Sequence, residues 1–209
     1  MKRARRPALI ATAVIVAVAV GVLWFPGESL RGTRPDAGAC VAPPGAEQRD
    51  LDPDDSSEAL WPHVAGERVV VHVAVGGLPA RYAALVVQAA GIWSRSPCVE
   101  LVVGAACPAG SHCSTVVARD RGNYDDTDAE SDSDDRAGVR RANTISLYRG
   151  LLDRESDNGV LATIVHEMGH TLGLVHRRDP GSVMNEETDD STDPVPDATD
   201  LANLAVLYG

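Results

Sequence analysis

Aromatic side chains are scarce in this chain of 209 residues. They account for 4% of the sequence, whereas hydrophobic residues as a whole account for 44%. Because aromatic side chains normally supply much of the buried area of a core, the core here has to be built mainly from Val, Leu, Ala and Ile. The length suits one domain with appendages.

Basic residues are also few, and they are unevenly placed. The formal net charge is −11. Four basic residues stand within the first seven positions, so the remainder of the chain carries −15. A surface with this charge repels a phosphate backbone, which excludes nucleic acid as a partner.

The sequence has no C-x-x-C pair, which argues against a zinc knuckle. It has four cysteines, Cys40, Cys98, Cys107 and Cys113. An even number in an exported protein indicates two disulfides. The segment from Cys107 to Cys113 is short and rich in turn formers, which favours a local bridge and leaves Cys40 to pair with Cys98.

The N-terminus carries the longest apolar run. Residues 8–25 are uncharged and follow a basic stretch. We expect residues 1–26 to form a signal anchor with its basic end in the cytoplasm, and a cleaved signal peptide is the alternative. Either one places the following chain outside the cytoplasm. Residues 27–66, rich in Pro, Gly, Asp and Ser, are expected to be a flexible linker or a short pro-like segment.

Residues 67–209 show the patterns of a mixed domain. β-Branched runs predict strands, and apolar residues at helical spacing predict helices. The expected strands are 69–75, 99–103, 115–118 and 143–148, and the expected helices begin at 79, 157 and 197. The opening order of strand, helix and strand predicts parallel pairing. The acid-rich residues 120–135 are expected to form a surface loop.

One stretch carries the chemistry: His166-Glu167-Met168-Gly169-His170, followed by Gly173 and His176. On a helix, His166 and His170 share a face. Gly173 can end the helix in a left-handed conformation, so that His176 approaches from another direction. Three neutral imidazoles leave one position of tetrahedral Zn²⁺ open, as catalytic sites require. Glu167 stands beside the metal without being a ligand, which suits a general base.

Further downstream, residues 181–185 include Met184 and resemble the Met-turn that lies beneath the metal in metzincin peptidases. The ending of the chain, at 196–201 and 207–209, resembles the C-terminal helix of the matrixin branch. The resemblance spans roughly residues 68–209. It implies an α+β, metzincin-like zincin fold: a twisted, mostly parallel sheet with two long helices, a Met-turn and a C-terminal helix.

The resemblance also implies an activity for residues 67–209. The expected function is that of a zinc endopeptidase, in which a zinc-bound water attacks the peptide bond with Glu167 as general base. Met184 would pack under the ligands, and the expected partner of the monomeric enzyme is a protein or peptide substrate. The alternative is a non-catalytic, zinc-stabilised extracellular binding module. Glu167 argues against it, because such a module needs no base beside its metal.

Three features depart from the matrixin pattern. Arg177, after the third histidine, matches neither the usual matrixin residue nor the usual astacin residue. Cys40 lacks the P-R-C-G-x-P-D flanks of a cysteine switch, which leaves a zinc-binding thiolate at Cys40 as the minor alternative to a disulfide. The acidic run at 125–135 has oxygen ligands for Ca²⁺ but no D-x-D-x-D-G frame. A mobile acidic rim that draws basic substrates is the favoured interpretation of that run, and calcium is the alternative.

Overall fold

The computed structural model describes residues 39–46, 58–120 and 127–209. The predicted signal anchor at 1–26 lies outside the described residues, as does much of the predicted linker at 27–66. Within the described ranges, no helix is both long enough and apolar enough to cross a membrane.

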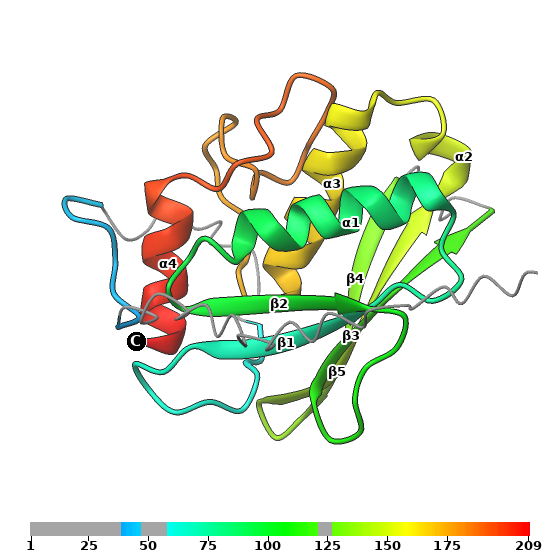
Figure 1. The fold of residues 1–209 in the computed structure, drawn as a ribbon. Coiled ribbons are helices and arrows are strands. Elements are labelled where there is room, and N and C mark those ends of the chain that lie inside the picture. The colour runs from blue at the N-terminus through cyan, green and yellow to red at the C-terminus, as the bar shows by residue number, and fades with distance from the viewer. Residues whose placement is uncertain (1–38, 47–57, 121–126) are drawn as a thin grey trace, which may run out of the picture. The chain divides into compact units, whose positions relative to one another are not determined.

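A five-stranded sheet forms the base of the fold, in the order β2-β1-β3-β5-β4 (Figure 1). Its strands are β1 (Val69–Ala74), β2 (Val99–Gly104), β3 (His112–Arg119), β4 (Ala129–Arg136) and β5 (Val139–Tyr148). All neighbours pair in parallel except β4 and β5, which are antiparallel. The parallel pairing predicted from the strand–helix–strand order is therefore confirmed, as is the mostly parallel sheet that the resemblance implied.

β4 corrects the sequence analysis, which expected a loop from 120 to 135. Ala129–Arg136 is a strand at the edge of the sheet, and its partner in the described chain is β5. Only Ala129 is buried, and most of the acidic side chains point to solvent. An edge strand tolerates charge that a central strand would not, because its outer side needs no apolar contact. Asp125 and Asp126 lie outside the described residues.

Helices α1 (Ala80–Trp93) and α3 (Asp157–Thr171) lie above the sheet and pack against each other (Figure 1). The apolar face predicted for α1 is buried, and it comprises Tyr82, Leu85, Val86, Ala89, Ala90 and Trp93. Trp93 also donates from Nε1 to the carbonyl of Val165 on α3, at 2.8 Å. The two long helices are thus joined by packing and by a buried hydrogen bond. A short helix, α2 (Arg149–Leu152), precedes α3 and was not predicted.

The structure corrects the predicted N-cap of one helix and agrees with the predicted N-cap of another. α3 is capped by Ser156, whose Oγ accepts from Gly159 N at 3.3 Å, rather than by the predicted residues 157–159. α4 (Ala198–Tyr208) begins at Asp197, as predicted, with a reciprocal capping box between Asp197 and Asp200.

Two residues that precede the expected domain start at 67 are part of the core. Cys40 is 4% exposed and Trp61 is 1% exposed. Trp61 donates from Nε1 to the carbonyl of Thr171, at the end of α3, at 2.8 Å. Cys40 is bonded to Cys98, and Cys107–Cys113 forms the second bridge, so both predicted disulfides are present. Cys40 therefore offers no thiolate for a switch, while the boundary at 67 stays a prediction.

Candidate metal centre

Three histidine rings converge at the C-terminal end of α3. His170 Nε2 lies 3.0 Å from His166 Nε2 and 3.2 Å from His176 Nε2. The three ligand atoms all lie within 4.8 Å of one another. The structure therefore brings together the three side chains that the spacing predicted.

The helix and its ending explain this convergence. His166 and His170 are four residues apart on α3, which places them on one face. Gly173 follows the C-cap residue Leu172 and has a φ of +91°. This is the positive φ predicted for the turn. Leu174 N donates to Gly169 O at 3.0 Å, which closes the helix end and sends the chain back toward His176.

Backbone carbonyls fix the tautomers of two rings. His166 donates from Nδ1 to Val183 O at 2.8 Å, and His170 donates from Nδ1 to Leu174 O at 2.8 Å. Because a carbonyl can only accept, each Nδ1 carries the proton and each Nε2 presents a lone pair. Burial, with the neighbouring His170, holds the pKa of His166 well below its usual value, so the ring stays neutral.

These rings fit a zinc ion. Lone pairs that face one another at 3.0–3.2 Å repel unless a cation lies between them. Tetrahedral Zn²⁺ with Zn–N bonds of about 2.0–2.1 Å places its nitrogens about 3.3–3.4 Å apart. The observed separations are within a few tenths of an ångström of that geometry.

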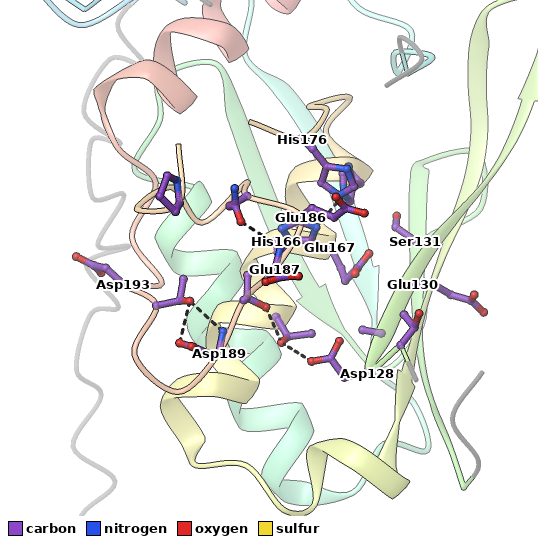
Figure 2. A pocket seen from close by; sticks show the side chains of 18 of the residues that line it. Asp128, Glu130, Ser131, His166, Glu167, His176, Glu186, Glu187, Asp189 and Asp193 are labelled. Carbon is purple, nitrogen blue, oxygen red and sulfur yellow. Dashed lines mark hydrogen bonds between the residues drawn. The ribbon is translucent and has the colours of Figure 1, made fainter. Parts of the chain in front are cut away.

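Glu167 lies beside the rings and faces the cleft (Figure 2). It is 7% exposed. Burial raises the pKa of Glu167 to about 8, and the charges of Asp128, Glu130 and Asp132 add to the shift. A buried carboxylate that lines the cleft is placed to hold and release a proton.

Met184 packs against α3 at Gly169, a glycine for which the sequence suggested no reason. A Cβ at Gly169 would lie 2.2 Å from Met184 Sδ and 3.2 Å from the Trp93 ring. Gly169 is therefore required by the close approach of the methionine rather than by a special φ. Val183, next to Met184, supplies the carbonyl that orients His166.

Arg177, which departs from the matrixin pattern, had no predicted role. Arg177 is 4% exposed and forms ion pairs with Asp197 and Asp200 at the start of α4. Burial opposes its charge, yet the hydrogen bonds to the two carboxylates outweigh this effect and raise its pKa. No local pattern could have revealed this, because the partners lie 20 and 23 residues further along the chain.

The cleft in front of the histidines is strongly acidic (Figure 2). It has a volume of about 1160 Å³, and neither Lys nor Arg is among its lining residues. Eight of these residues are acidic: Glu58, Asp128, Glu130, Glu167, Glu186, Glu187, Asp189 and Asp193. β4 and the residue before it supply one side, and residues 185–193 supply the other.

The acidic residues do not gather as a metal site within the described ranges. Among the described residues, one group of three or more His, Cys, Asp or Glu side chains has its ligand atoms close together, and it consists of His166, His170 and His176. Asp128 accepts a hydrogen bond from Thr163, and Glu130 accepts one from Tyr148. The structure therefore gives no support to the calcium alternative.

Residues 108–209 match the family model of the matrixins, Peptidase_M10, and this segment includes all three histidines, Glu167 and Met184. Over this segment the chain is matrixin-like, which supports a zinc metallopeptidase. The match spans just under half of the chain. Together with the five-stranded sheet, the two long helices and the C-terminal helix, the match makes the fold metzincin-like.

Two solved structures resemble the matrixin-like chain. The first is high choriolytic enzyme 1, a hatching-enzyme zinc protease from the medaka fish Oryzias latipes, with a TM-score of 0.48 and 16% identity over 76% of this chain and 98% of that one. The second is archaemetzincin from Methanopyrus kandleri, with a TM-score of 0.42 and 16% identity over 68% and 97%. No curated protein sequence matches.

Proposed function

We propose that the matrixin-like chain is a zinc-dependent endopeptidase that works outside the cytoplasm, with residues 67–209 as its catalytic domain. One observation carries the proposal. Three imidazole nitrogens converge beside the buried carboxylate of Glu167 in an open cleft. We further propose that residues 1–26 export the domain as an anchor or a cleaved signal, and that 27–66 link it to that segment.

His166, His170 and His176 would hold the zinc ion through their Nε2 atoms. When bound there, the metal polarises the carbonyl of the scissile bond and lowers the pKa of water. Val183 O and Leu174 O keep two of the rings in the ligating tautomer. Met184 contributes packing beneath α3 and no ligand atom.

Glu167 would act as the general base. Its carboxylate takes a proton from the attacking water and passes it to the nitrogen of the leaving amine, so that one group serves both steps. Burial raises the pKa of Glu167, and a zinc ion held by the three histidines would lower it again and favour the carboxylate form that accepts the proton.

The test is the Glu167→Ala variant. We expect kcat for casein hydrolysis to fall by about 10²–10⁴-fold, while the zinc content stays at one per chain. Exposed Glu67, away from the cleft, provides the matched control in Glu67→Ala, which is expected to keep full activity. Near-normal kcat in the Glu167 variant would rule out the assigned role.

The alternative of a non-catalytic binding module makes a different prediction. Wild-type protein that holds one zinc ion and yet shows no chelator-sensitive hydrolysis of any peptide library would favour it. The carboxylate beside the rings is the observation against this alternative.

Cleft charge gives an expectation about substrates. With eight acidic and no Lys or Arg residues around the cleft, peptides with basic residues near the scissile bond should be preferred. In paired peptides that differ only by Lys or Glu at the flanking positions, kcat/KM should favour the Lys peptide. The preference should shrink as NaCl rises from 0.05 to 0.5 M, roughly as the Debye length shortens. Equal kcat/KM at low salt would contradict the expectation.

A further inference from the structure

The residue that follows the third histidine is the centre of a buried network. Arg177 donates from Nη1 to Ser182 Oγ at 3.1 Å, to Asp197 Oδ1 at 2.8 Å and to Asp200 Oδ1 at 2.9 Å. Ser182 Oγ also donates to Asp200 Oδ1, at 3.1 Å. Asp200 is fully buried and Ser182 is 1% exposed. Charges removed from water to this extent persist only when they are paired and hydrogen-bonded.

The backbone of Arg177 is held as firmly as its side chain. Arg177 N donates to Met184 O at 2.7 Å, and Asn185 donates from Nδ2 to Arg177 O at 3.0 Å. Arg177 and Asn185 also form an isolated parallel bridge. Ser182 Oγ accepts from Met184 N at 3.0 Å, which links the Met-turn to the same guanidinium.

The same two carboxylates begin α4. Asp197 Oδ1 accepts from Thr199 N at 2.7 Å and from Asp200 N at 2.9 Å, while Asp200 Oδ2 accepts from Asp197 N at 2.9 Å. The capping box and the ion pairs therefore share Asp197 Oδ1, and they use the two oxygens of the same Asp200 carboxylate. The start of α4, the Met-turn and the residue after His176 form one structural unit.

We propose that Arg177 is a positioning residue, which fixes the third metal ligand, His176, by tying its backbone to the Met-turn and to the N-terminus of α4. The backbones of His166 and His170 need no such tie, because α3 positions both of them. The network then governs how tightly the metal is held and how fast the reaction runs. It leaves the binding of substrate unchanged, because Arg177 does not line the cleft. This inference rests on the proposed zinc site.

The variants Asp197→Asn and Asp200→Asn test the proposal. Asn caps a helix about as well as Asp, so Asp197→Asn should keep the start of α4 while it removes a charge from Arg177. We expect zinc affinity, measured by competition with a chelator, to fall by about 10–100-fold. kcat should fall, while KM should stay within twofold of the wild-type value. The visible absorption of the Co²⁺-substituted protein should lose intensity. In the metal-free protein, amide exchange at residues 174–178 should accelerate.

Arg177→Lys should give an intermediate result, because Lys keeps the charge and loses the planar fork. The double variant Arg177→Met with Asp200→Asn separates positioning from stability. It removes both buried charges together, so its unfolding midpoint should approach that of the wild type, while its zinc affinity stays low. Val71→Ala, in β1 of the core, is the control for destabilisation alone and should keep wild-type zinc affinity.

Two results would overturn the proposal. One is wild-type zinc affinity and kcat in both Asn variants. The other is a double variant that regains zinc affinity together with stability, since the network would then be merely structural. A wild-type protein that binds no zinc would refute the proposed function as well, whereas normal zinc affinity in the Asn variants refutes only the role of Arg177.

Discussion

The proposed metal ligands are held in two different ways. His166 and His170 lie four residues apart on one helix, so the backbone hydrogen bonds of α3 set their spacing. His176 lies in an irregular segment, and its neighbour Arg177 is fixed by Ser182, Asp197 and Asp200. The positions of His166 and His170 thus depend on local helical structure. The position of His176 depends on contacts with residues further along the chain.

Each of these two parts of the site contacts a buried arginine, Arg140 beside α3 and Arg177 beside His176. Arg140, 1% exposed, donates to the carbonyls of His170 and Thr171 and pairs with Glu58 and Asp135. It satisfies acceptors at the C-terminal end of α3, where the helix dipole is negative. Arg177, by contrast, meets carboxylates at the N-terminus of α4. Arginine therefore stabilises the C-terminal end of α3 at position 140 and the irregular segment after His176 at position 177.

The largest effect is expected from the ligands themselves. His170→Ala and His176→Ala should each weaken zinc affinity by more than about 100-fold, beyond the range typical of changes outside the ligand shell. Because α3 forms without His176, the circular dichroism of metal-free His176→Ala should match that of the wild type. Metal analysis of the purified variants checks the prediction. Full zinc occupancy in His170→Ala would remove the basis of the site.

Arg140→Met tests the part that depends on the helix. It leaves two carbonyls and Glu58 without their partner, so the free energy of unfolding should fall by about 3 kcal/mol, at the lower end for a broken buried pair because Glu58 is partly exposed. Urea unfolding of the metal-free protein measures the change. Arg149→Met, which breaks exposed pairs with Asp120 and Asp153, is the control and should cost less than about 1 kcal/mol. Equal losses would show that Arg140 has no special role.

Two glycines with nearly the same φ allow backbone strain to be separated from steric contact. Gly173 has a φ of +91°, and an added Cβ would lie 2.5 Å from Leu60 Cδ2; Gly77 has a φ of +92° with nothing within 4 Å. Both Val variants should lose about 1–3 kcal/mol of stability through strain. Only Gly173→Val should also lose zinc affinity, because its turn leads to His176. Retained affinity in a folded Gly173→Val protein would contradict this account of the turn.

The smallest effect is expected at the start of α3, ten residues before His166. Ser156→Ala should cost about 1 kcal/mol of stability, the usual value for a lost N-cap, with zinc affinity unchanged. Asp157→Ala, at an exposed position, should change stability by no more than about 0.5 kcal/mol. Urea unfolding of the two variants decides between the observed cap and the neighbouring residue. A larger loss at Asp157 would restore the sequence-based interpretation.

The features that the sequence revealed are those with a local cause. The i, i+4 spacing of His166 and His170 and the glycine at 173 are periodic or conformational signals, and the apolar face of α1 is another. β4 gave no such signal, because its acids are tolerated only through its edge position beside β5. Arg177 was visible only as a departure from a pattern, since its partners become neighbours only in the folded chain.

The bridge between Cys40 and Cys98 joins positions 58 residues apart. A single peptide-bond cut anywhere between them leaves two pieces that remain covalently attached. Such a clipped molecule would migrate as one band on a non-reducing gel and as two after reduction. A cut before Cys40, in contrast, would release everything upstream. Self-cleavage at these two places would therefore have opposite outcomes, retention in one case and liberation in the other.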